Sequence, residues 1–331
     1  MARVNEQRFL VTGAFGCIGA WTVKRLVDAG HPVWTYDLPG NPHRLQLIMD
    51  DASLARVHLL QGDITDAAQV ERALVDHGIT HIIHLAALQV PFVRADPIRG
   101  ALVNVVGTTI VFEMAKRHRA QIAGLVYASS MGVYGPADRY PDAPLAHDAP
   151  LMPPTLYGVN KQANEGTAQV YWDEYQLPSI GIRPYVVYGP GRDQGWTSTP
   201  TKAMLAAAAG RDYEISYGGT CVFQYADDVA AICVAAVQAD YQGADVFNIG
   251  GSTASMDDVV AAIDAAAPAM AGRISYVPAP LPHPPTVDAT PLDRAIGVQH
   301  YTPLSTGVAA TVDHFRWAIA HDKIDVARVL G

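Results

Sequence analysis

Two side chains four residues apart, Tyr157 and Lys161, are the pair in this sequence best suited to proton transfer. On a helix, that spacing puts the phenol and the ammonium on one face. The charge of Lys161 favours the phenolate and is expected to lower the pKa of Tyr157 toward working pH, so that Tyr157 exchanges a proton with a substrate alcohol or carbonyl. Such a pair also arises by chance, so its meaning depends on what accompanies it.

A pair of serines, Ser129 and Ser130, follows the apolar run that ends at Ala128. If that run is a strand of a parallel sheet, its carboxyl end lies at the edge where ligands bind. The Ser130 hydroxyl could then hydrogen-bond the reacting oxygen. The alternative is an ordinary serine-rich strand exit.

A glycine-rich stretch, Thr12–Gly19, follows an apolar run and precedes a helical pattern. Glycines let the backbone approach a ligand closely, and the helix N-terminus favours an anionic pyrophosphate. A plain tight turn between strand and helix is the alternative. The position after the first strand favours a dinucleotide site.

Three further strand ends supply groups that fit a dinucleotide. Asp37 lies eighteen residues beyond Gly19, near the spacing of a carboxylate that bonds an adenosine ribose, which predicts NAD as cofactor. Asp63 could accept a bond from the adenine amino group, and Ala86 and Ala87 leave room for the cofactor. The alternatives are a turn-capping role for Asp37 and a helix N-cap role for Asp63.

The elements that must position these groups alternate between strand and helix, which predicts an α/β fold with a doubly wound parallel sheet of the Rossmann type. The expected strands are Phe9–Thr12, Pro32–Tyr36, Val57–Gln61, His81–Leu85, Ile122–Ala128 and Ser179–Ile182. The expected helices between them are Ile18–Ala29, Ala67–His77, Pro97–Arg117 and Leu156–Tyr175.

The pattern changes after Pro190, where Pro-rich and Gly-rich segments such as Pro278–Pro285 separate the helices. We therefore expect an NAD-binding domain over residues 1–188 and a smaller substrate-binding lobe over residues 189–331. The lobe is discontinuous, because Val246–Ile249 is expected to return to the sheet as a strand. The expected helices of the lobe are Pro200–Ala209, Asp227–Gln238 and Ser255–Ala267.

The amino-acid composition limits the classes of binding partner that we expect. The 331 residues carry a net charge of −9, so no broad basic surface is expected for nucleic acid or an anionic membrane. The most apolar stretches, such as Val229 to Val237, are shorter than the ~20 residues of a membrane span. Three widely spaced cysteines indicate neither a disulfide framework nor a thiolate zinc site, which fits the cytoplasm, and no metal site is expected.

Together these motifs resemble the extended short-chain dehydrogenase/reductases, the NAD-dependent epimerase/dehydratase family, over nearly the whole chain. The resemblance implies Tyr157 as acid/base, Lys161 on the nicotinamide ribose, Ser130 on the substrate oxygen, and Asn104 supporting a water or backbone link near Lys161. The motifs that carry it are Thr12–Gly19, Asp37, Asp63, His84–Ala87, Asn104–Thr108, Ser130 with Val133–Gly135, Tyr157 with Lys161, Arg183–Arg192 and Tyr225–Val229. The residues expected to touch NAD are Gly13, Phe15, Gly16, Cys17, Ile18, Gly19, Asp37, Leu38, Asp63, Ile64, Leu85, Ala86, Ala87, Asn104, Ser129, Tyr157, Lys161, Pro184 and Val187.

Departures from the family pattern bear on the substrate. Met131 and Gly132 stand where sugar 4,6-dehydratases carry Asp-Glu, which argues against water elimination. Val186 and Cys221 stand where nucleotide-sugar epimerases commonly carry Asn and Arg near the diphosphate. We therefore expect a substrate without a nucleotide diphosphate, unless other arginines compensate. The expected substrate-binding residues are Ser130, Met131, Tyr157, Val186, Arg192 and Cys221, and Arg192 and Arg211 are the candidate compensating arginines.

The expected function is an NAD-dependent oxidoreductase that moves hydride to or from a secondary alcohol of a sugar, sugar acid or similar polar small molecule. The alternative is a nucleotide-sugar epimerase that keeps NAD bound. A non-catalytic NAD sensor is a third hypothesis, but it would not need Tyr157, Lys161 and Ser130 together. The helices Pro97–Arg117 and Leu156–Tyr175 resemble those through which family members form homodimers, although burial within the monomer gives the same pattern.

Overall fold

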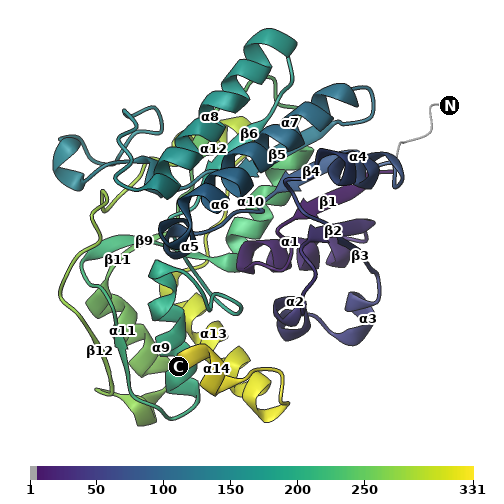
Figure 1. Cartoon of the computed structure of the whole chain (residues 1–331). Coiled ribbons are helices and arrows are strands. Elements are labelled where there is room, and N and C mark those ends of the chain that lie inside the picture. Colours follow the sequence, from purple (N-terminus) through teal and green to yellow (C-terminus); the bar gives the residue numbers. More distant parts are fainter. Residues whose placement is uncertain (1–5) are drawn as a thin grey trace.

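A computed structural model describes residues 6–331 and contains a central sheet of seven parallel strands, in the order β10-β6-β5-β4-β1-β2-β3 (Figure 1). Each neighbouring pair is parallel, so every strand needs a crossover connection. The strands are β1 (Phe9–Thr12), β2 (Val33–Asp37), β3 (Val57–Gln61), β4 (His81–His84), β5 (Gly124–Ala128), β6 (Ile180–Arg183) and β10 (Val246–Asn248). The doubly wound fold is thereby confirmed, including the late return of β10 beside β6.

Helices cover both faces of the sheet. Strand residues alternate between the two faces, so Phe9 and Val11 pack into one hydrophobic core and Leu10 packs into the other. The first core includes buried residues of α1 (Cys17–Asp28) and α10 (Ala226–Gln238). The second includes those of α4 (Ala67–Val75), α7 (Gly107–Arg117) and α8 (Leu156–Tyr175).

The predicted helix Pro97–Arg117 is interrupted. It consists of α6 (Pro97–Ala101), a π-helical turn over Leu102–Val106, and α7. By length and composition this 21-residue run could cross a membrane, but half of its apolar window is buried inside the molecule, and buried residues of α7 belong to the second core. A buried core helix has the same composition as a membrane span.

The helices α9 (Thr199–Ala208), α11 (Met256–Ala266), α13 (Leu304–Ala320) and α14 (Val326–Leu330) lie together below the large sheet in Figure 1. The chain also contains a three-stranded sheet in the order β11-β9-β7 and a parallel pair, β8 and β12. These strands are β7 (Val186–Tyr188), which lies within residues 1–188, and β8 (Tyr213–Ile215), β9 (Thr220–Tyr225), β11 (Ser252–Ser255) and β12 (Ile274–Tyr276). The remaining helices are α2 (His43–Ile48), α3 (Asp51–Leu54), α5 (Val90–Ala95) and α12 (Thr290–Ile296).

Candidate active site

The glycine-rich turn between β1 and α1 packs too tightly for larger residues. Gly13 has a φ of +68°, and a Cβ placed there would lie 2.6 Å from the backbone nitrogen of Ala86. A Cβ on Gly19 would lie 2.3 Å from the Gly13 carbonyl oxygen. Glycine at position 13 therefore lets the turn approach the chain that follows β4, and glycine at position 19 lets α1 pack against the turn. The N-terminal residues of α1 line a large cavity, as an anion site requires.

Asp37, at the end of β2, is held by the same turn. Its Oδ2 accepts a hydrogen bond from the Phe15 amide at 2.9 Å, and its Oδ1 accepts one from the Leu38 amide at 2.9 Å. Burial raises the pKa of Asp37, whereas the two amides and the charge of Arg44 oppose that shift. A carboxylate has further lone pairs, so Asp37 remains able to accept hydrogen bonds from a ribose.

One cavity of about 720 Å³ joins this turn to the predicted reacting residues. It extends from Asp37 and Asp63, past Tyr157, to a wall at Leu281–His283. All the residues expected to touch NAD line it except Asn104: Gly13, Phe15, Gly16, Cys17, Ile18, Gly19, Asp37, Leu38, Asp63, Ile64, Leu85, Ala86, Ala87, Ser129, Tyr157, Lys161, Pro184 and Val187. The fold thus gathers residues from distant parts of the sequence at the carboxyl ends of the strands.

Tyr157 and Lys161 both line this cavity from α8. The helix begins after Thr155, whose hydroxyl accepts a hydrogen bond from the Gly158 amide at 3.1 Å. Lys161 Nζ lies 5.9 Å from the centre of the Tyr157 ring and donates to the Ala128 carbonyl oxygen at 2.7 Å. The ammonium is therefore fixed at the end of β5, beside the phenol.

The pKa of Tyr157 is shifted in the opposite direction to the sequence-based expectation. Burial raises the pKa of Tyr157, while a hydrogen bond from Ser130 and the charge of Arg192 act against the rise. Burial also lowers the pKa of Lys161 to about 8, against the charge of Glu165. The expectation that Lys161 brings the pKa of Tyr157 down is therefore not met, because burial outweighs the groups that favour the phenolate.

Ser130 and Ser129 follow β5 but have different partners. Ser130 Oγ accepts a hydrogen bond from the Gly132 amide at 3.0 Å, and Ser130 lines the cavity with Met131. Ser129 is buried, and its hydroxyl donates to Glu165. Ser130 is therefore the serine whose hydroxyl is available beside Tyr157.

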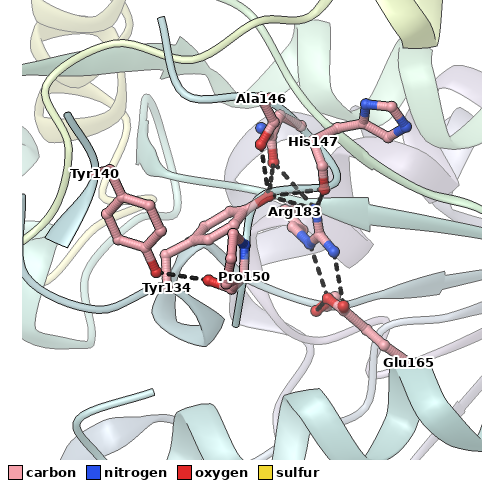
Figure 2. A network of polar contacts seen from close by, with 9 residues as sticks. Tyr134, Tyr140, Ala146, His147, Pro150, Glu165 and Arg183 are labelled. Carbon is pink, nitrogen blue, oxygen red and sulfur yellow. Dashed lines mark hydrogen bonds and ion pairs between the residues drawn. The ribbon is translucent and has the colours of Figure 1, made fainter. Parts of the chain in front are cut away.

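A buried charged network connects α8 with β6 and with the loop that contains Tyr134 and His147 (Figure 2). Arg183 on β6 donates to Glu165 on α8 through Nε at 2.8 Å and Nη2 at 2.7 Å. Its Nη1 donates to the Tyr134 hydroxyl and the His147 carbonyl oxygen. Because Glu165 also holds Ser129, one ion pair connects α8, β6 and the end of β5.

Asn104 does not line the cavity, so its expected contact with the cofactor is corrected. The side chain is fully buried within the π-helical turn. Its Oδ1 accepts from the Leu88 amide at 2.7 Å and its Nδ2 donates to the Leu88 carbonyl oxygen at 2.9 Å. Asn104 thus fixes the loop after β4, which forms a cavity wall, by bonding Leu88, whereas the link expected of it was one near Lys161.

Two expected substrate contacts, Val186 and Cys221, also lie outside the cavity. Tyr185 and Val187 line it, and alternation along β7 turns Val186 into the core, where it is fully buried. Cys221 on β9 is buried opposite Ala254 of β11, and burial raises the pKa of its thiol to about 12. Arg211 is exposed and does not line the cavity, whereas Arg192 does.

Residues of the segment Gly189–Thr197 also line the cavity, and beyond Arg192 the sequence analysis did not anticipate them. The Pro190 carbonyl oxygen accepts a hydrogen bond from Trp21 Nε1 at 2.9 Å, which ties the segment to α1. Asp193 accepts from Arg44 Nη2 at 2.6 Å, and Arg44 Nη1 donates to the Phe15 carbonyl oxygen at 2.6 Å. Further cavity-lining residues that sequence reasoning missed are Gln89, Phe92, Arg94, Arg99, Tyr185, Gln194, Trp196, Thr197, Leu281, Pro282 and His283.

These features fit a dinucleotide. The turn with Gly13 and Gly19, here called the glycine cradle, leaves no room for side chains where a pyrophosphate would approach α1. Asp37 lies at the end of the neighbouring strand and lines the same cavity. Asp63 is bound at Oδ1 by the Thr65 amide and hydroxyl, and at Oδ2 by Arg99 at 3.2 Å. A Rossmann sheet with this cradle and a Tyr/Lys/Ser cluster defines the class of NAD-dependent short-chain dehydrogenase/reductases.

Comparison with known proteins identifies the family within that class. Residues 9–250 match the model of the NAD dependent epimerase/dehydratase family, and the chain belongs to it. The chain is 32% identical to a UDP-glucose 4-epimerase of Mycolicibacterium smegmatis, with 93% of this chain and 98% of that protein covered. It is 30% identical to UDP-glucuronate 4-epimerase 3 of Arabidopsis thaliana, with 71% of this chain and 56% of that protein covered.

A solved structure shows the same fold with the cofactor in place. The UDP-glucose 4-epimerase of Thermus thermophilus in complex with NAD superposes with a TM-score of 0.76 at 27% identity, with 94% of this chain and 100% of that chain covered. The chain described here is accordingly an NAD-dependent enzyme of the extended short-chain dehydrogenase/reductase type.

Proposed function

We propose that this enzyme moves hydride between NAD and a secondary carbinol of a sugar, sugar acid or similar polar small molecule. The observation that carries the proposal is that Tyr157, Lys161 and Ser130 line the same cavity as the glycine cradle and Asp37. A protein that only sensed NAD would need the cradle but not the cluster.

The roles of the side chains follow from their chemistry. NAD, when bound, accepts or returns the hydride. Tyr157 as phenolate takes the hydroxyl proton of the substrate carbinol, and as phenol it returns a proton to a carbonyl oxygen. Ser130 orients that oxygen, and its hydrogen bond together with the charge of Arg192 favours the phenolate. Lys161, whose Nζ donates to the Ala128 carbonyl oxygen at the end of β5, would hold the nicotinamide ribose when NAD is bound.

The fate of the oxidised product separates two candidate functions. A net dehydrogenase releases a ketone or lactone and exchanges its cofactor, whereas an epimerase reduces the intermediate on the opposite face and keeps NAD. The similarity to a UDP-glucose 4-epimerase over 98% of that protein favours the second function. Incubation with NAD and a panel of sugars, sugar acids and nucleotide sugars decides between them through NADH absorbance and product stereochemistry. A panel that gives neither NADH nor an epimer would contradict both.

We further propose that the substrate lacks a nucleotide diphosphate. The proposal rests on Val186 and Cys221, which stand where nucleotide-sugar epimerases commonly carry Asn and Arg, and neither side chain lines the cavity. Calorimetric titration of the NAD-bound protein with UDP and UDP-glucose tests this directly. No binding is expected, and micromolar binding would establish the nucleotide-sugar epimerase instead.

We propose a cytoplasmic homodimer that associates through α6 to α8. These helices expose apolar side chains, and among them Ile98 is 76% and Leu156 is 55% exposed. Pairing the same face of two copies would bury them with two-fold symmetry. Sedimentation of the wild-type protein and of Val159→Glu tests the proposal, with a dimer and a monomer expected.

Residues 1–188 and 189–331 remain our proposed division into a cofactor domain, completed by β10, and a substrate lobe.

A further inference from the structure

Arg192, which lines the cavity from the segment Gly189–Thr197, carries a charge that no carboxylate among the described residues neutralises. Its Nη2 donates to Thr197 Oγ1 at 3.1 Å, and its Nε is buried with no hydrogen-bond partner. Over residues 6–331, no carboxylate lies within ion-pair distance of it. A partly buried guanidinium with an unsatisfied donor is costly to fold, so it calls for a ligand that completes it.

The nearest acidic residue in sequence, Asp193, is occupied elsewhere. Its Oδ1 accepts hydrogen bonds from Arg44 Nη2 and Nε at 2.6 and 2.9 Å, and its Oδ2 lies 3.4 Å from His43 Nε2. These partners hold the pKa of Asp193 at about 2 despite burial. Asp193 thus anchors the segment to α2, and the charge of Arg192 is left to the cavity.

Arg192 lines the same cavity as the residues of both functional ends. Its charge acts on the pKa of Tyr157 at the reacting end and on that of Cys17 at the start of α1. A Cβ on Gly195 would lie 3.3 Å from Arg192 Nη2 and 2.0 Å from Gln89 Oε1. Arg192 and Gln89 therefore share one corner of the cavity, where a guanidinium and an amide converge.

We propose that Arg192 binds an oxyanion, and that this oxyanion is a carboxylate of the substrate beside the carbinol that reacts at Tyr157. A guanidinium matches a carboxylate with two parallel hydrogen bonds, and the Gln89 amide could bind a neighbouring hydroxyl. The pyrophosphate of NAD is the other source of the same chemistry, but the glycine turn and α1 already provide for it. The inference rests on the proposed function and narrows its substrate to a polyhydroxy acid.

The test compares acids with their neutral counterparts. NAD-bound wild-type protein, Arg192→Gln and Arg192→Lys are titrated calorimetrically with D-galacturonate against D-galactose, D-glucuronate against D-glucose, and D-gluconate against D-glucitol. NAD affinity is measured separately for each variant. Arg211→Gln is the matched control, because Arg211 is exposed and outside the cavity.

Wild type and Arg211→Gln should bind at least one acid about 10- to 100-fold more tightly than its neutral partner, as one charge-assisted interaction implies. Arg192→Gln should abolish that preference with NAD affinity unchanged, and Arg192→Lys should retain part of it. A wild-type protein that binds the acids no more tightly than their neutral partners would overturn the inference. An Arg192→Gln variant that loses equal affinity for the acid and for its neutral partner would overturn it as well. Loss of NAD affinity alone would assign Arg192 to the pyrophosphate. An acid that binds without hydride transfer would count against the proposed function and leave the carboxylate site standing.

Discussion

Glu165 and Arg183 form a two-point ion pair in which the Oε2 to Nη2 distance is 2.7 Å and both side chains are at most 7% exposed. Glu165 lies one helical turn beyond Lys161 and also accepts the hydroxyl of Ser129, while Arg183 holds the Tyr134–His147 loop (Figure 2). The pair therefore links the helix that carries Tyr157 to the strand ends that face it.

Glu165→Gln should lower the free energy of unfolding by about 3–5 kcal/mol, because it leaves the Arg183 charge buried without its partner. Urea denaturation measures the loss. Adding Arg183→Met should recover part of it, since the uncompensated charge is then removed. Asp313→Asn, which breaks the exposed Arg316–Asp313 pair, is the matched control and should change little. Equal effects of Glu165→Gln and Asp313→Asn would contradict this account.

The enzyme should bind NADH at least tenfold more tightly than NADPH, a difference of about 1.4 kcal/mol. Asp37 would repel a ribose 2′-phosphate, and the neighbouring Arg44 is engaged by Asp193, Gly191 and Phe15 and so cannot compensate. Fluorescence titration of both cofactors measures the ratio. Asp37→Ser should reduce the ratio of the two dissociation constants. Tighter binding of NADPH than of NADH to the wild type would refute the assignment of NAD as the cofactor.

His84 should make the fold sensitive to acid. It is buried between Thr12 Oγ1 at 2.7 Å and Thr108 Oγ1 at 3.0 Å, and burial lowers the pKa of His84 from 6.5 to about 3. Below pH 6.5 the unfolded chain binds a proton that the folded protein does not, so the free energy of unfolding falls as the pH drops from 6.5 toward 3, and the contribution is fully present above pH 6.5.

Urea titrations across that range should give a steeper pH dependence for wild type than for His84→Asn. His58→Asn is the control, because His58 is exposed on β3. Identical slopes for wild type and His84→Asn would show that His84 does not titrate differently in the two states.

Local signals made part of this structure predictable. The helix Leu156–Tyr175 matches its predicted bounds because Thr155 caps one end and Gln176, with a φ of 51°, terminates the other. The glycine turn and Asp37 lie together on one cavity, because their spacing follows from the connection between strand and helix, and their contact with NAD stays a prediction.

The features that the sequence did not indicate depend on contacts between residues that are far apart in the chain. The π-helical turn in Pro97–Arg117 brings Asn104 to Leu88, and no periodicity in the helix indicates that partner. The inward turn of Val186 depends on how β7 sits beside the cavity and β9. Arg44 and Asp193 are 149 residues apart in sequence, so neither indicates the other, and the isolation of Arg192 could be seen only in the folded molecule.

The most direct measurement of the central claim follows hydride transfer in wild type and Tyr157→Phe, each saturated with NAD. Rapid mixing with the substrate found in the panel gives NADH absorbance in the first turnover, and product analysis gives any epimer. The account predicts that Tyr157→Phe binds NAD as tightly as wild type but forms NADH or epimer about 10²–10⁴-fold more slowly, because only the proton-transfer group is missing. A Tyr157→Phe variant that matches the wild-type rate would show that the reaction does not run through this phenol.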